Sequence, residues 1–322
     1  MDELVYIKRD FKSNPAYGVP PRKRTIEQLL NTGFINLDKP KGPTSHQAVA
    51  QIRKILGVKK AGHTGTLDPE VSGVLPILLG SSVYAASYLN KDKEYIGVMH
   101  LHKNVEEQKI KDSFEKFKGE ITQIPPVKSA VARKPRKRKI YELEIIEMDG
   151  RDILFRAKVE AGTYIRKLVH DIGQYLGAGA NMTDLRRISV MDLTENDSIT
   201  LHKLAEASWL FKQENDDRLL REYVFPIEDV LDKFGIKFIW VSDYAVDPLC
   251  SGAQLMEPGV VAFNQGIKEG ETVAIMTLKD ELIGFASSLY SSEDLIEVEN
   301  KQVTKTLRII MPRGIYPKWQ KK

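Results

Sequence analysis

Hydrophobic residues recur at helical spacing in two long stretches of the chain and in a short one marked by Ile110, Phe114 and Phe117. The first follows a possible cap at Thr44 or Ser45 and ends at Gly57. The second follows a cap at Thr163 and ends at Gly177. The apolar faces consist of Ala48, Val49, Ile52, Ile55 and Leu56 in the first stretch, and of Ile165, Leu168, Val169, Ile172 and Leu176 in the second.

Continuous or alternating apolar runs predict strands around these helices. The runs cover residues 33–39, 74–79, 94–101 and 155–160. Strands and helices do not alternate regularly, which favours an α+β domain with a mixed sheet and flanking helices. From about residue 238, short β-rich runs separated by Gly and acidic turns predict a small β-barrel. We therefore expect an N-terminal extension (1–30) that packs on the C-terminal domain, a main domain (31–235) and a C-terminal domain (236–322).

The composition excludes several classes of protein and site but does not indicate a particular reaction. The 322 residues carry a net charge of only +4, so the overall balance is a weak argument for a polyanionic partner. A single cysteine excludes an intrachain disulfide and a cysteine zinc site. No stretch is apolar enough for a signal peptide or a membrane span, so we expect a cytoplasmic protein with no membrane contact. Charge is concentrated in one run, residues 133–139, with six cations in seven residues.

A loop between two predicted elements holds a single carboxylate under unusual constraint. Asp68 lies between Leu67 and Pro69, with glycines before and after them. Pro69 biases Asp68 toward an extended backbone. From the residues alone, Asp68 is either a functional acid on a fixed loop or a structural acid that caps a turn.

Several segments resemble one enzyme family. "GHTGTLDP" followed by "SGVLP" (residues 62–76) is similar to the catalytic motif of the pseudouridine synthases that include bacterial tRNA pseudouridine-55 synthase and the dyskerin-type enzymes. "LDKPKGPTSH", "KEYIGVMHLH", "EAGTYIRKLVHDIG" and "MTDLRRISV" match further motifs of that family, and residues 124–145 and 311–319 resemble its dyskerin-type, archaeal branch. The C-terminal part resembles a PUA domain, an RNA-binding barrel.

The resemblance assigns roles to particular residues. It implies that Asp68 is the nucleophile, that Arg166 pairs with it and that Tyr95 is the active-site tyrosine. It also implies that the segment starting at Leu37 buttresses the Asp68 loop. The residues implied for substrate binding are His63, Tyr164, Leu185 and Lys39, with Lys39 as a phosphate or loop contact.

The chemistry of uridine isomerisation fits such a set. The N1–C1′ bond breaks, the base turns, and C5 joins C1′, so one nucleophile is required and no metal or other cofactor is expected. A carboxylate can attack C6 of uracil or assist departure of the base at C1′, and the sequence leaves both routes open. A nearby cation would keep the acid ionised in a dry pocket. The target base must leave its helix and lie against apolar or aromatic side chains.

The basic run predicts RNA contact through a flexible loop. The residues concerned are Arg133, Lys134, Arg136, Lys137, Arg138 and Lys139. The dyskerin-type resemblance implies work in an H/ACA ribonucleoprotein, with a guide RNA, small H/ACA core proteins, and rRNA or tRNA as substrate. The alternatives are a stand-alone tRNA pseudouridine-55 synthase and a non-catalytic RNA-binding scaffold.

Overall fold

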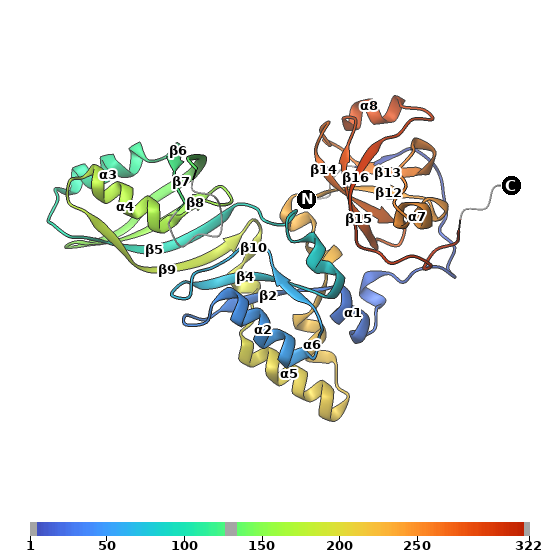
Figure 1. Cartoon of the computed structure of the whole chain (residues 1–322), viewed down its shortest axis with the longest axis horizontal. Coiled ribbons are helices and arrows are strands. Elements are labelled where there is room, and N and C mark those ends of the chain that lie inside the picture. Colours follow the sequence, from blue (N-terminus) through green and yellow to red (C-terminus); the bar gives the residue numbers. More distant parts are fainter. Residues whose placement is uncertain (1–4, 126–133, 319–322) are drawn as a thin grey trace.

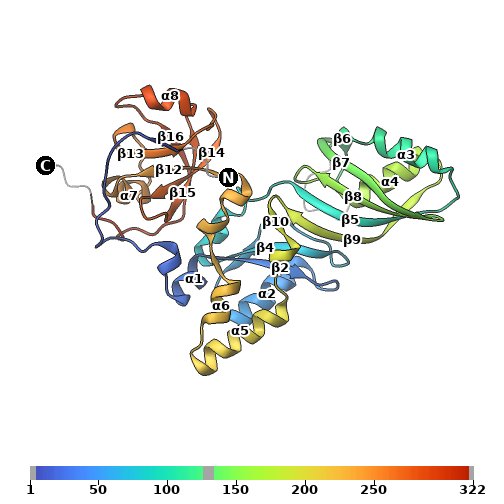
Figure 2. The same ribbon diagram turned by 180° about the vertical axis from the view of Figure 1, so that it is seen from behind.

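The computed structural model describes residues 5–125 and 134–318. Two sheets organise them, one of ten strands and one of six. Figure 1 shows the larger sheet with its helices on one side of the molecule and the smaller sheet on the other, and Figure 2 shows the same arrangement from behind. None of the helices in the described residues is both long and apolar enough to cross a bilayer.

The larger sheet has the order β11-β2-β4-β9-β5-β8-β7-β6, with β3 added to β4 and β10 added to β9. All its pairs are antiparallel except β4 with β9. Its strands are β2 (Gly33–Lys39), β3 (Ala61–His63), β4 (Ser72–Leu79), β5 (Lys93–Leu101), β6 (Gly119–Gln123), β7 (Arg136–Asp149), β8 (Asp152–Val159), β9 (Ala180–Val190), β10 (Leu193–Thr194) and β11 (Phe225–Pro226).

Four helices of this part lie in two groups. Figures 1 and 2 place α2 and α5 against the β2–β4 half, and α3 and α4 against the half that contains β5, β7 and β8. Apolar side chains from both groups share one core with the sheet. The helices are α1 (Ile26–Thr32), α2 (Ser45–Leu56), α3 (Glu107–Lys116), α4 (Ile165–Tyr175), α5 (Leu201–Glu214) and α6 (Arg218–Tyr223).

The two halves of the sheet meet at a short parallel contact. Only Ser72 and Gly73 of β4 pair with β9, opposite Arg186 and Arg187. Gly73 has φ +103°, and a Cβ at this position would overlap the carbonyl of Arg187. Glycine is therefore required for the close approach. The loop that contains Asp68 ends directly at this junction.

The smaller sheet has the order β1-β13-β12-β14-β15-β16 and is also mixed, because β12 and β14 are parallel. Strand β1 pairs with β13, so residues near the N-terminus belong to this C-terminal sheet. Its elements are β1 (Val5–Ile7), β12 (Lys237–Val241), α7 (Asp243–Cys250), β13 (Val260–Asn264), β14 (Thr272–Thr277), β15 (Leu282–Ser288), α8 (Ser292–Glu297) and β16 (Thr304–Ile309).

The two parts of the chain share an apolar interface. One buried cluster joins Phe34, Val74 and Leu78 of the larger sheet with Met276 and Phe285 of the smaller one. Tyr88 stacks on Phe285, with ring centroids 4.6 Å apart. An interface this apolar fixes the relative orientation of the two parts, because separating them would expose core side chains to water.

Residues 26–32 form α1, a helix that the sequence patterns did not predict. The helix is capped by Thr25, whose side chain accepts a hydrogen bond from the Gln28 backbone. One sequence prediction needs correction here, because Thr163 does not cap the second predicted helix. Its hydroxyl donates to the Glu160 carbonyl, and Tyr164 is the residue that precedes α4.

A nearly buried ion pair holds the N-terminal segment to the rest of the fold. The two terminal nitrogens of the Arg24 guanidinium, Nη1 and Nη2, donate to Glu228, each at 2.9 Å, and the Leu282 backbone donates to the same carboxylate. Arg24→Met would leave Glu228 buried and unpaired, so we expect it to lower the free energy of unfolding by about 3–5 kcal/mol.

Arg22→Met is the matched control, since Arg22 is 83% exposed in its ion pair with Asp229 and such pairs contribute at most ~1 kcal/mol. Denaturant unfolding of both variants makes the comparison. Equal losses would mean that the Arg24 pair does not stabilise the arrangement.

Candidate active site

The Asp68 loop, residues 64–71, connects β3 to β4 and is fixed from both sides. The hydroxyl of Ser45, the first residue of α2, accepts a hydrogen bond from the Leu67 backbone at 2.8 Å and donates to its carbonyl at 2.9 Å. Gly42 donates its backbone N–H to the carbonyl of Pro69 at 2.9 Å. These contacts hold the residues before and after Asp68. The Asp68 side chain therefore extends from a backbone that is fixed on both sides.

Lys39 also holds this loop, through its side-chain ammonium. Its side chain is fully buried, and its ammonium donates to the carbonyls of Pro40 (2.8 Å), Pro69 (3.2 Å) and Val71 (2.9 Å). Burial lowers the pKa of Lys39, and the nearby Glu70 carboxylate partly opposes that. A direct phosphate or substrate contact is therefore wrong for Lys39, because the ammonium has no access to solvent. The other predicted role of Lys39, a contact with the loop, is the one observed.

Asp68 and Arg166 form an ion pair. The Asp68 Oδ2 atom lies 2.8 Å from Nη2 of Arg166, and the side chains are 55% and 59% exposed. Arg166 is the second residue of α4, where a positive charge is disfavoured by the helix dipole unless an anion offsets it. The pairing expected from the sequence is present, but the expected burial is not, since both groups are in contact with water.

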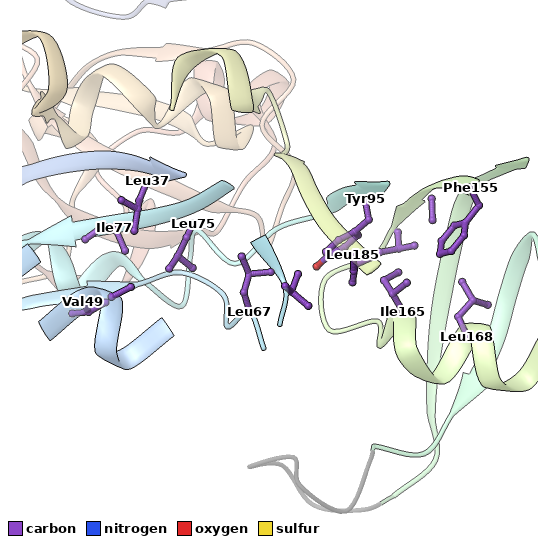
Figure 3. Packing of buried hydrophobic residues seen from close by; sticks show 14 of the residues in the cluster. Leu37, Val49, Leu67, Leu75, Ile77, Tyr95, Phe155, Ile165, Leu168 and Leu185 are labelled. Carbon is purple, nitrogen blue, oxygen red and sulfur yellow. The ribbon is translucent and has the colours of Figure 1, made fainter. Parts of the chain in front are cut away.

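Apolar and aromatic side chains gather beside this pair. Tyr95 on β5 is 6% exposed, and Leu185 on β9 is 5% exposed. Figure 3 shows both near Leu67 of the Asp68 loop and Ile165 of α4, where the two halves of the sheet meet. Tyr164 precedes α4 and is half-buried, with its backbone N–H and carbonyl both hydrogen-bonded to the side-chain amide of Gln123.

His63 lies at the end of β3, and its ring centroid is 5.2 Å from that of His46 in α2. Burial lowers the pKa of His63 to about 4, with smaller contributions from His46 and Arg187. The ring is therefore neutral at physiological pH. It can contact a base through shape or a hydrogen bond, but it offers no positive charge to a phosphate.

Two buried cations behind the loop were not singled out from the sequence. Arg187 is fully buried, and its guanidinium donates to the carbonyls of Val74 (2.6 Å) and Gly65 (3.1 Å). Lys93 is 7% exposed and donates to Asn90 and to the Lys91 carbonyl. Burial, followed by repulsion from Arg187, lowers the pKa of Lys93 to about 7.

The basic run differs from the predicted flexible loop. Residues 136–139 begin strand β7 and pair with β6, and only Lys134 of the predicted contacts lies in a described segment without regular structure. Lys137 pairs with Glu120 at 2.8 Å, and Arg138 lies 3.8 Å from Glu160. Arg133 lies outside the described residues. The cations at the start of β7 are thus presented on a strand next to the turn that precedes α4.

The depressed pKa of Lys93 makes folding depend on pH. Between about 7 and the ordinary value of 10.5, the unfolded chain holds a proton that the folded chain has released. Stability should therefore rise with pH across this window, and below it the full cost of the buried charge applies. We expect Lys93→Met to have a higher free energy of unfolding than the wild type at pH 6, by on the order of a few kcal/mol. This difference should become smaller toward pH 10.

Denaturant unfolding at several pH values measures the difference, and Lys103→Met, at an exposed position beyond the same strand, is the control. A difference in unfolding free energy that does not change with pH would contradict a lowered pKa of Lys93 in the folded protein.

Protein-family models cover nearly the whole chain. Residues 53–165 match the N-terminal domain of TruB family pseudouridylate synthase, and residues 166–232 match the C-terminal domain of tRNA pseudouridylate synthase B. Residues 237–310 match the PUA domain, and residues 1–49 match the DKCLD (NUC011) domain. The PUA match coincides with most of the smaller sheet.

Two curated relatives are similar over nearly their full length. Both are named "Probable tRNA pseudouridine synthase B". The protein of Pyrobaculum islandicum is 46% identical over 99% of this chain and 97% of its own length. The protein of Pyrococcus abyssi is 46% identical over 98% of this chain and 94% of its own length.

Solved structures give the same result. A chain from the "Crystal Structure of a Cbf5-Nop10-Gar1 Complex" aligns with a TM-score of 0.91 and 44% identity over 99% of this chain and 97% of that one. A chain from the "Structure of H/ACA RNP bound to a substrate RNA containing 2'-deoxyuridine" aligns with a TM-score of 0.89 and 42% identity over 99% of this chain and 98% of that one. The chain therefore belongs to the TruB/Cbf5-type family of pseudouridine synthases, enzymes that isomerise uridine in RNA.

Proposed function

We propose that this enzyme is the catalytic subunit of an H/ACA guide ribonucleoprotein and converts selected uridines to pseudouridine in rRNA, with tRNA as a further substrate. The observation that carries the proposal is the Asp68–Arg166 ion pair, placed beside Tyr95 and Leu185. Guide dependence is supported by similarity, over nearly the full chain, to proteins solved in Cbf5 and H/ACA complexes. A guide RNA and small H/ACA core proteins are the proposed partners, and the cytoplasm is the proposed location.

Asp68 is the proposed nucleophile. Its fixed backbone and its pairing with Arg166 hold one carboxylate in a defined position and favour its charged form when water leaves. The carboxylate either adds to C6 of the uracil or assists departure of the base from C1′. In both routes Arg166 orients Asp68 and limits the cost of removing its hydration shell.

The extruded base has its proposed place against Tyr95 and Leu185, with Tyr164 and His63 near the opening. In this proposal Tyr95 stacks on the base, and its hydroxyl helps to remove the C5 proton. Leu185 supplies an apolar wall through its buried side chain. Stacking and apolar walls of this kind are how enzymes hold a flipped nucleotide.

RNA contacts outside the pocket follow from charge and from the domains. We assign phosphate contacts to Arg133, Lys134 and the cations at the start of β7, and guide RNA binding to the PUA domain. The proposed division of the chain is an arm (1–30), a catalytic domain (31–235) and the PUA domain (236–322). Pairing of β1 with β13 supports an arm that packs on the PUA domain.

The second candidate is a stand-alone tRNA pseudouridine-55 synthase, and the names of the curated relatives favour it. Unmodified tRNA incubated with the purified protein alone separates the two functions. Efficient conversion without a guide would support the stand-alone enzyme. A requirement for guide RNA and partner proteins would support the guided one. A non-catalytic scaffold is disfavoured, because it would have no use for the Asp68–Arg166 pair beside a buried tyrosine.

Replacement of Asp68 tests the chemistry. Asp68→Asn keeps the size of the side chain but removes the nucleophile, so we expect pseudouridine formation to fall by at least ~10⁴-fold, as when a covalent catalyst is lost. RNA binding should change little. Glu70→Gln, an exposed carboxylate two residues later, is the control. Pseudouridine mapping in guided RNA makes the measurement, and an active Asp68→Asn protein would contradict the proposal.

The role of the basic run is tested by salt dependence. Each phosphate contact that is lost should reduce the slope of log binding constant against log salt concentration by about 0.7–0.9. We therefore expect Lys134→Gln combined with Lys137→Gln to flatten the slope for substrate RNA. Lys109→Gln with Lys111→Gln, two exposed lysines on α3, should leave it unchanged. Equal slopes for the two double variants would argue against an RNA contact by the run.

A further inference from the structure

An ion pair joins two strands of the larger sheet that are not neighbours. Arg186 of β9 and Asp38 of β2 are separated by β4, yet both terminal nitrogens of the Arg186 guanidinium donate to the Asp38 carboxylate, at 3.0 and 3.1 Å. Between them the guanidinium passes Ser72 of β4, whose hydroxyl lies 3.4 Å from Nη1. The pair therefore spans the junction at which the two halves of the sheet meet. A bidentate pair of this kind fixes orientation as well as distance.

The residues next to this pair in sequence hold the Asp68 loop. Lys39 and Arg187 lie in one row across β2, β4 and β9, because Gly73 of β4 is the cross-strand partner of both. Successive residues of a strand point to opposite faces, so the residue before each of these cations points away from the loop. Exposure agrees with this, since the two cations are fully buried, whereas the two members of the ion pair are 28% and 35% exposed.

The two buried cations are attached to opposite ends of the loop. Arg187 donates to the carbonyl of Gly65, before Asp68, and Lys39 donates to two carbonyls that follow Asp68. A change in the spacing of β2 and β9 would therefore move one end of the loop relative to the other. The carboxylate of Asp68 would move with it.

Side-chain links across β4 are few. Backbone pairing of β4 with β9 is limited to Ser72 and Gly73. Within residues 5–125 and 134–318, one other ion pair connects residues 36–41 with β9, that of Lys41 with Asp184, and its side chains are 47% and 49% exposed. Such exposed pairs contribute little. Glu195, the second carboxylate on Arg186, follows β10, a strand that pairs with β9, so this contact does not span β4.

We propose that the Arg186–Asp38 ion pair is a positioning pair for the isomerisation. It sets the spacing of β2 and β9, and through the two buried cations it keeps the Asp68 carboxylate beside Arg166. The inference rests on the proposed function, in which Asp68 reacts with the substrate, and neither member of the pair touches the reacting atoms. A reacting group that is misplaced by about 1 Å can lose on the order of 10²-fold in rate.

The test uses the full chain with guide RNA and partner proteins. Single-turnover rates of pseudouridine formation and affinities for substrate RNA are measured for the wild type, Arg186→Met, Asp38→Asn and the double variant. Arg186→Met should slow the reaction by ~10- to 10²-fold and leave the affinity little changed. Asp38→Asn should also be slower than the wild type. The double variant should be no slower than Arg186→Met, because both changes break the same contact.

Glu195→Gln is the matched control, because it removes the other ion pair of Arg186 and leaves the contact across β4 in place. Its rate should match that of the wild type. Arg186→Lys should recover only part of the rate, since an ammonium cannot make the bidentate contact. If Arg186→Met does not fold, Asp38→Asn and Arg186→Lys make the same comparison.

Hydrogen exchange separates positioning from a general loss of stability. In the loop, the backbone N–H of Leu67 donates to the Ser45 hydroxyl and that of Val71 donates to the Asp68 carbonyl. Arg186→Met should speed the exchange of these two amides and leave exchange in β8, away from the junction, unchanged. A pair that only stabilises the fold would lower the free energy of unfolding and leave the rate of the folded enzyme as it is.

An unchanged single-turnover rate in Arg186→Met, or an equal loss in Glu195→Gln, would overturn the inference while leaving the proposed function intact. An inactive wild type, or an active Asp68→Asn protein, would instead overturn the proposed function. The two failures are therefore distinguishable.

Discussion

The fixed backbone of residues 64–71 is the constraint on which the rest of the site depends. A single carboxylate has a defined position only if the loop around it cannot move, and here the restraints come from two separate parts of the chain, residues 39–45 and Arg187. Ser45 holds Leu67, Lys39 and Gly42 hold Pro69, and Arg187 holds the Gly65 carbonyl. With the loop held, the start of α4 decides where Arg166 meets Asp68.

The Asp68–Arg166 ion pair is exposed to solvent in the RNA-free protein. This exposure limits what the pair contributes to the stability of the fold. An exposed pair adds little to stability, because water screens the charges and the side chains lose freedom. The same pair becomes far stronger once a bound nucleotide excludes water, since the effective dielectric constant falls. Under the proposed function, bound RNA completes the dry pocket that the sequence led us to expect. The buried cations that contact the loop are Lys39 and Arg187, and both donate to its backbone carbonyls.

Features that depend on residues close together in the sequence could be predicted, and features that depend on distant pairing could not. Helix α2 was predicted with both ends correct, because Thr44 caps it through Gln47 and Gly57 adopts φ 72° at its end. The cap of α4 was misassigned, since the Thr163 hydroxyl satisfies a carbonyl in the preceding turn. Helix α1 was missed because it is short and follows a proline-rich segment. The strand at Arg136 depends on pairing with β6, which no local pattern of charges reveals.

The same distinction applies to the site. The predicted pairing of Asp68 with Arg166 came from motifs, and the structure brings the two side chains together. The buried states of Lys39, Lys93 and Arg187 could not be predicted, because burial of a charged residue is decided by how distant strands pack. In "LRRISV", strand alternation puts Arg187 on the face of Leu185, but residue type argues for the surface.

The most direct measurement is an experimental structure of the full chain with guide RNA, partner proteins and a substrate RNA. The account predicts a target base that is extruded between Tyr95 and Leu185, with the Asp68 carboxylate in contact with both the nucleoside and Arg166 and with water excluded from the pair. A target base bound elsewhere, with Asp68 still in bulk water and separated from Arg166, would contradict the account.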